Sequence, residues 1–100
     1  MSSSAKFEAK LREGVEKTIA LGYTPTKFVS MLNSRDAVVL AKGLIASGDI
    51  QDGMQKVVDL GAPQLTMESI MLEADFAGLF TQGELEAAKW RLERARNHRK

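Results

Sequence analysis

The chain has 100 residues, which is enough for one hydrophobic core and too short for two. Apolar residues make up 44% and charged residues 27%, a composition typical of a folded domain rather than a disordered segment. The absence of cysteine excludes disulfides and thiolate chemistry, and the net charge of +1 excludes a strong overall attraction to nucleic acid or membrane.

No apolar run approaches the roughly twenty residues that a membrane-spanning helix needs. The N-terminal stretch MSSSAKFEAKL lacks the apolar segment and the cleavage site of an exported precursor. We therefore expect a cytoplasmic protein with a single domain over residues 1–100. Its ends, residues 1–3 and 97–100, are expected to fray.

The first predicted helix follows Ser4, a residue type that commonly caps helix N-termini. Apolar residues then recur every fourth position, at Phe7, Leu11, Val15 and Ile19. Gly22 can end this helix in the left-handed conformation. Gly14 lies in its interior, where glycine costs about 1 kcal/mol relative to alanine, and a close neighbour would explain its presence.

The next stretch, GYTPTKFVSML, predicts a junction between two helices. Thr24 can cap the second helix, and Pro25 suits its first position because the missing N–H has no partner there. Tyr23 and Phe28 have the spacing of a hydrophobic staple, and Phe28, Met31 and Leu32 form the inward face. The alternative interpretation of this stretch is a ligand-binding motif.

Two more helices are predicted in the middle of the chain. Ser34 is the expected N-cap of the first and Asp49 that of the second, while Gly48 and Gly61 follow their ends. The inward residues are Val38, Ala41, Leu44 and Ile45 in the first helix and Met54, Val57 and Val58 in the second.

Three helical segments follow the break at Pro63. Thr66 caps a short helix around Ile70, and Phe76, Leu79 and Phe80 have helical spacing on another short turn. Thr81 and Glu84 match a capping box that opens the last helix, whose inward residues are Leu85, Ala88 and Leu92. Since no segment alternates apolar and polar residues, we expect an all-α fold, a single compact bundle of six or seven short helices.

The residues that catalysis requires are missing or badly placed. His98 is the only histidine and lies in the expected frayed tail. Glu73 and Asp75 are two positions apart, so they diverge on a helix and do not form a metal site. The glycines form no nucleotide-binding motif. We expect a protein that is not an enzyme and that uses no cofactor or metal.

The charged residues are distributed unevenly. No basic residue occurs between Lys56 and Lys89, and that span contains Asp59, Glu68, Glu73, Asp75, Glu84 and Glu86. From Lys89 onward the sign reverses, with Arg91, Arg94, Arg96, Arg99 and Lys100 opposed only by Glu93. Both groups could be solvated helix faces. Alternatively, the basic end contacts phosphate or carboxylate, and the acidic stretch occupies a basic nucleic-acid channel on another protein.

Trp90 lies to one side of the last helix, beside arginines, as interface anchors often do. The candidate partner-binding residues are therefore Asp59, Glu68, Glu73, Asp75, Glu84, Glu86, Trp90, Arg91, Arg94 and Arg96. A further possibility is a helical oligomerisation domain with an adaptable apolar surface formed by Met31, Met54, Met67 and Met71.

Four stretches, GYTPTKFVSML, QLTMESIML, DFAGLF and ELEAAKWRL, together resemble a pattern found in small helical proteins and domains of bacterial and phage genomes. The pattern has a basic and an acidic residue after the glycine of GAPQLT, where this chain departs from it. In size, charge balance and lack of an active site, the chain is similar to anti-CRISPR proteins that block type I surveillance complexes.

This resemblance implies stoichiometric inhibition, in which a preformed surface docks on the crRNA-guided complex and keeps target DNA from its channel. Our leading hypothesis is thus a non-enzymatic protein-interaction module from a phage or mobile element. The alternative is a nucleic-acid-binding or operon-partner accessory protein that uses the basic C-terminal helix.

Overall fold

The described part of the chain is built from α-helices and short 3₁₀ turns. The computed structural model describes residues 2–47 and 52–97, and those residues contain no strand. The elements are α1 (Ser3–Ala20), α2 (Thr26–Ser34), α3 (Ala37–Ala46), α4 (Asp52–Asp59), the 3₁₀ turn η1 (Pro63–Leu65), α5 (Met67–Met71), the 3₁₀ turn η2 (Ala77–Leu79) and α6 (Gln82–Asn97). The predicted all-α bundle is confirmed.

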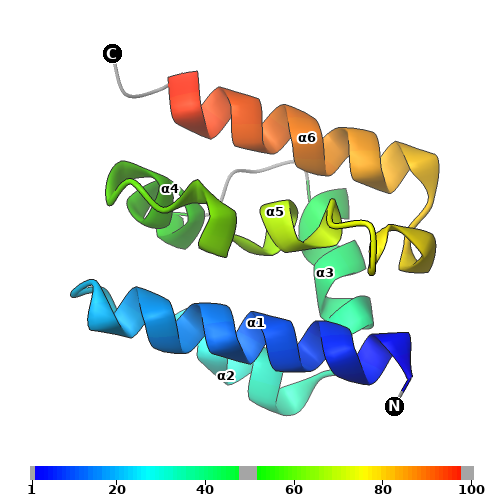
Figure 1. Ribbon diagram of the computed structural model, residues 1–100, viewed down its shortest axis with the longest axis horizontal. Helices are drawn as coiled ribbons and strands as arrows, with labels where there is room; N and C mark the ends of the chain where they lie inside the picture. The colour runs from blue at the N-terminus through cyan, green and yellow to red at the C-terminus, as the bar shows by residue number, and fades with distance from the viewer. Residues whose placement is uncertain (1, 48–51, 98–100) are drawn as a thin grey trace.

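The two longest helices, α1 and α6, lie on opposite sides of the molecule with α4 and α5 between them (Figure 1). Helix α5 contacts both of them, and α3, which lies behind in this view, also contacts both. Helix α2 packs against α3. Within residues 2–47 and 52–97, no helix has the length and apolar character that crossing a bilayer requires.

Phe7 of α1 lies at the centre of the main core and is 0% exposed. Its ring meets those of Phe76 and Phe80 edge to face, with centroids 5.6 and 5.3 Å apart. Burying one such side chain contributes about 1.5–3 kcal/mol, and an aromatic pair adds about 0.5–1.5 kcal/mol. Phe7 thus ties α1 to the segment around η2. The remaining core residues include Leu11, Leu32, Leu40, Ala41, Ile45, Ile70 and Met71.

Helix α4 packs on α6 through a second, smaller cluster of Met54, Val58 and Ala95, with the half-buried Leu92 against it. Val57 is buried as well. The predicted inward face of α4 is therefore confirmed.

Several predicted helix ends are confirmed. Gly22 and Gly61 have φ values of 106° and 83°, in the left-handed region that favours glycine. The Thr66 hydroxyl accepts a hydrogen bond from the Ser69 backbone N–H at 3.1 Å, as expected of the cap of α5.

Other predicted caps are wrong by one or two positions. The side chain that accepts the free N–H of Ala5 belongs to Ser2, not Ser4, so α1 begins at Ser3. Ser34 is the last residue of α2, and its hydroxyl donates to the Met31 carbonyl at 3.2 Å. Asp36 caps α3 instead, because its carboxylate accepts from two backbone N–H groups.

The start of α2 also differs from the prediction. Pro25 occupies the N-cap position instead of the first helical position, so α2 begins one residue later than predicted. No side chain caps the helix. Thr24 contributes its carbonyl, which accepts from the Thr26 N–H at 2.9 Å. The predicted stop at Gly48 and cap at Asp49 lie outside the described residues. Ser3 and Asn97, predicted to fray, are the first residue of α1 and the last of α6.

Candidate functional site

Helix α6 carries an exposed tryptophan with an arginine in contact with its ring. Trp90 is 52% exposed, and the Arg94 guanidinium lies 5.4 Å from the ring centroid. The two residues are one helical turn apart, so their side chains lie on the same side of the helix. A guanidinium at this distance from an indole face makes a cation–π contact. The sequence places Trp90 to one side of the helix, away from the inward residues, and the structure shows that the ring is exposed there.

Glu86 lies one turn before Trp90 on the same side of α6. It is exposed, and its carboxylate accepts a hydrogen bond from the Gln82 side-chain amide at 3.3 Å. We call Glu86, Trp90 and Arg94 the Trp90 surface. It combines a large apolar ring with one charge of each sign.

Glu68 and Arg91, both predicted at a partner-binding surface, are instead buried against each other. Their side chains are 3% and 2% exposed, and the Arg91 Nε donates to Glu68 Oε2 at 3.2 Å. The prediction is wrong for these residues because Glu68 on α5 and Arg91 on α6 face each other across a helix contact. Burial raises the pKa of Glu68, and hydrogen bonds from its own backbone N–H and from Arg91 oppose that rise.

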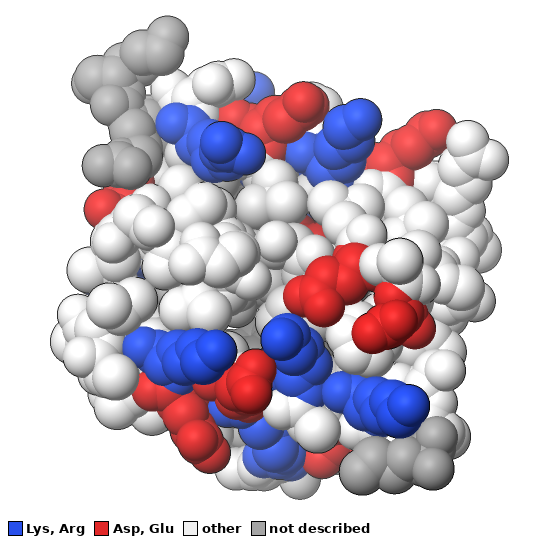
Figure 2. All heavy atoms as spheres, in the orientation of Figure 1, with Lys and Arg blue, Asp and Glu red and all other residues white. Residues whose placement is uncertain are grey.

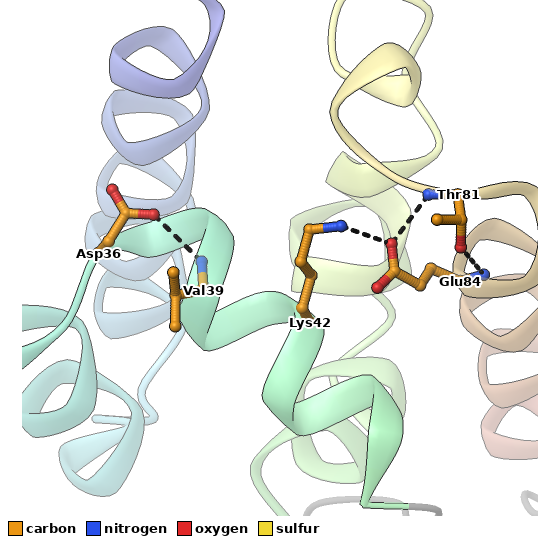
Figure 3. Close-up of polar contacts among 5 residues, drawn as sticks. All are labelled: Asp36, Val39, Lys42, Thr81 and Glu84. Carbon is orange, nitrogen blue, oxygen red and sulfur yellow. Dashed lines mark hydrogen bonds and ion pairs between the residues drawn. The ribbon is translucent and has the colours of Figure 1, made fainter.

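Glu84 is held in a polar cluster rather than free for a partner (Figure 3). Its Oε1 accepts from the Lys42 ammonium of α3 and from the Thr81 backbone N–H, each at 2.8 Å. The Glu84 N–H in turn donates to the Thr81 hydroxyl at 3.1 Å, which confirms the predicted capping box. The Lys42 ammonium, followed by the Thr81 N–H, lowers the pKa of Glu84.

The remaining acidic candidates come from separate places in the fold. Glu73 and Asp75 follow α5, and Asp59, whose Oδ1 accepts from the Gln55 side chain at 3.0 Å, ends α4. Figure 2 shows acidic side chains over the segment that joins α5 to η2, where Glu73 and Asp75 lie. Along α1 and α6 in the same view, basic and acidic side chains are mixed. On the face shown in Figure 2, the acidic and basic stretches of the sequence therefore do not form one acidic region and one basic region.

Within the described part of α6, the exposed basic group lacks one of its predicted members. Lys89, Arg94 and Arg96 are exposed on the described part of α6, whereas Arg91 is buried. His98, Arg99 and Lys100 lie outside the described residues. Among the described residues, no group of three histidine, cysteine, aspartate or glutamate side chains is placed to hold a metal ion.

The Trp90 surface is thus a part of the predicted site that remains together and exposed, and the pairing of Glu68 with Arg91 is a feature that the sequence does not predict. Comparison of the chain with protein-family models, with curated proteins and with solved structures finds no match in any of the three.

Proposed function

We propose that this protein is a non-enzymatic protein-interaction module that binds its partner through the Trp90 surface. The observation that supports the proposal is the half-exposed Trp90 ring with the Arg94 guanidinium over it. Tryptophan and arginine are, with tyrosine, enriched among the few side chains that dominate binding energy at protein interfaces.

The arrangement of the Trp90 surface favours binding for two physical reasons. The indole loses its remaining contact with water when a partner covers it, which stabilises the complex in proportion to the apolar area buried. Because Arg94 already contacts the ring in the free protein, its side chain loses less conformational entropy when a partner binds. Glu86 and Arg94 add charges that a complementary partner surface can pair.

We further propose that the partner is a type I crRNA-guided surveillance complex and that the bound module keeps target DNA out of its channel. The support for this partner is the similarity of the chain to anti-CRISPR proteins in size, charge balance and lack of an active-site motif. The exposed Asp75 and the half-buried Glu73, between α5 and η2, would compete with DNA phosphates for basic side chains of the channel.

The test is a pull-down and a DNA-binding competition with a panel of purified type I complexes. We expect the wild-type chain to co-purify with a complex and to prevent it from binding target duplex. Trp90→Ala should weaken that binding about 30-fold or more, as is usual for an interface anchor. The matched control is Val39→Ala, which removes an apolar side chain that is 61% exposed on α3 and should leave binding unchanged.

Two outcomes would contradict the proposal. Failure of every complex in the panel to bind would reject the proposed partner, and equal binding by Trp90→Ala would reject the proposed surface. Direct binding of the chain to the duplex, with affinity that falls steeply with salt and is lost in Arg94→Gln, would favour the nucleic-acid-binding alternative.

A further inference from the structure

A cavity of about 400 Å³ lies among α1, the loop after it, α2, α4 and the start of α5. Its apolar lining includes Val15, Phe28, Met31, Met54, Val57 and Met67. Pockets of roughly 300–1,000 Å³ lined mainly by apolar side chains are typical sites for small molecules. Trp90 does not line it, so the cavity is separate from the Trp90 surface.

The buried wall of the cavity has polar groups that are already paired. The Thr18 hydroxyl donates to the Gly14 carbonyl at 2.7 Å, and the Thr66 hydroxyl donates to the Pro63 carbonyl at 2.7 Å. Glu68, also in the lining, is bonded to Arg91. This end can therefore accommodate hydrocarbon, and burying an anion here would cost desolvation that these already paired groups do not offset.

The exposed rim carries positive charge. Lys27 is exposed and lines the cavity, and the Lys56 ammonium lies 5.6 Å from the ring centroid of Tyr23, which also lines it. Neither lysine forms an ion pair with any side chain that the structure describes. The rim thus offers cations to an anion, whereas the carboxylate at the buried end is already paired with Arg91.

We propose that this cavity binds an amphipathic monocarboxylate. Its apolar body would lie among Phe28, Met31 and Met54, and its carboxylate would lie at the rim beside Lys27 and Lys56. An anion in this orientation keeps its contact with water and with the two ammonium groups, whereas the reverse orientation would bury it next to Glu68. The stretch GYTPTKF would then be both a helix junction and the rim of a ligand site.

The test is an NMR titration of the full-length protein, labelled with ¹³C at the methionine methyl groups, with sodium decanoate below its micellar concentration. We expect saturable shifts of the methyl signals of Met31, Met54 and Met67, which line the cavity. The Met71 signal should move little, because Met71 is 0% exposed and outside the lining. Absence of any shift, or an equal shift of Met71, would overturn the proposed site.

The head-group assignment is tested with matched charge variants and an uncharged probe. Lys27→Gln and Lys56→Gln should each weaken decanoate binding by up to about fivefold, the range of an exposed ion pair, and leave decanol binding unchanged. Lys6→Gln removes one charge from α1 outside the lining and should change neither. If Lys27→Gln and Lys56→Gln behave like Lys6→Gln, the proposed carboxylate position is wrong.

Discussion

At the scale of single residues, Gly14 shows how a helix can require glycine in its interior. Gly14 is buried on α1, and a Cβ built there would lie 3.0 Å from the Leu65 carbonyl oxygen of η1. That distance is shorter than ordinary van der Waals contact, and the atom it meets is backbone rather than a flexible side chain. The sequence predicts a close neighbour at Gly14, and the structure identifies it as η1.

We therefore expect Gly14→Ala to destabilise the protein although alanine is the better helix former. On an exposed helix the change would stabilise by about 1 kcal/mol, but here η1 must move away from α1. Urea unfolding measures the difference. The matched control is Gly43→Ala on α3, where a Cβ meets nothing within 4 Å and the change should stabilise by up to about 1 kcal/mol. Equal stabilisation by both variants would contradict the expectation.

At the scale of helices and turns, the sequence predicts which helices form better than it predicts the residues at which they begin. The four-residue spacing of apolar residues places α1 correctly because that period is set by helix geometry. The first cap is wrong because MSSSAK offers several serines with equal capping ability, and only the packing of α1 decides among them. Asp36 displaces Ser34 for a similar reason, since both residue types cap well and α2 continues through Ser34.

The capping box of α6 predicts a dependence of stability on pH. The pKa of Glu84 is lower in the folded protein than in the unfolded chain. The ionised Glu84 therefore stabilises the fold fully at pH values above its unfolded pKa, and this stabilisation is lost as the pH falls through its folded pKa. Glu84→Gln should lower the free energy of unfolding by about 0.5–1 kcal/mol at neutral pH. This difference from wild type should shrink below about pH 4.5.

Urea unfolding at several pH values checks this prediction. Glu86→Gln is the matched control, because it removes a carboxylate from the same helix and leaves the contacts with Thr81 and Lys42 intact. A difference between Glu84→Gln and wild type that stayed constant down to about pH 3 would mean that Glu84 acts by shape rather than by charge.

At the scale of the whole molecule, polar contacts between distant segments hold α6 on the bundle. Lys42 of α3 reaches Glu84, and Gln55 of α4 donates to the Ala95 carbonyl at 2.9 Å. Glu68 of α5 bonds Arg91 of α6, 23 positions away in the sequence. The apolar spacing that identifies helices does not encode which helix faces meet. The prediction that Glu68 and Arg91 lie at the surface therefore rests only on their charge.

The same limit applies to the two candidate sites. Trp90 could be predicted as exposed because it falls outside the apolar stripe of a single helix. The cavity could not be predicted, because its lining comes from several elements and exists only once they pack. From the sequence, GYTPTKF could be interpreted as a helix junction or as a ligand-binding motif. The position of α4 beside it supports the proposal that it is a junction that also lines a ligand site.

The Glu68–Arg91 pair gives a prediction about the assembly of the bundle as a whole. Removing one partner leaves the other charge buried without compensation, so Arg91→Met should lower the free energy of unfolding by about 3–5 kcal/mol. Replacing both, as Glu68→Leu with Arg91→Met, removes the charges together and should recover most of that loss, because the buried apolar replacements need no partner.

Urea unfolding of the single and double variants separates the ionic from the packing contribution of Arg91. Arg96→Met, which changes an exposed arginine on the same helix, is the control and should alter stability by no more than about 0.5 kcal/mol. A double variant as unstable as Arg91→Met would mean that Arg91 stabilises the bundle through its shape and its other contacts. Recovery would instead mean that the pair mainly specifies how α5 and α6 meet, since an apolar contact of similar volume holds them about as firmly.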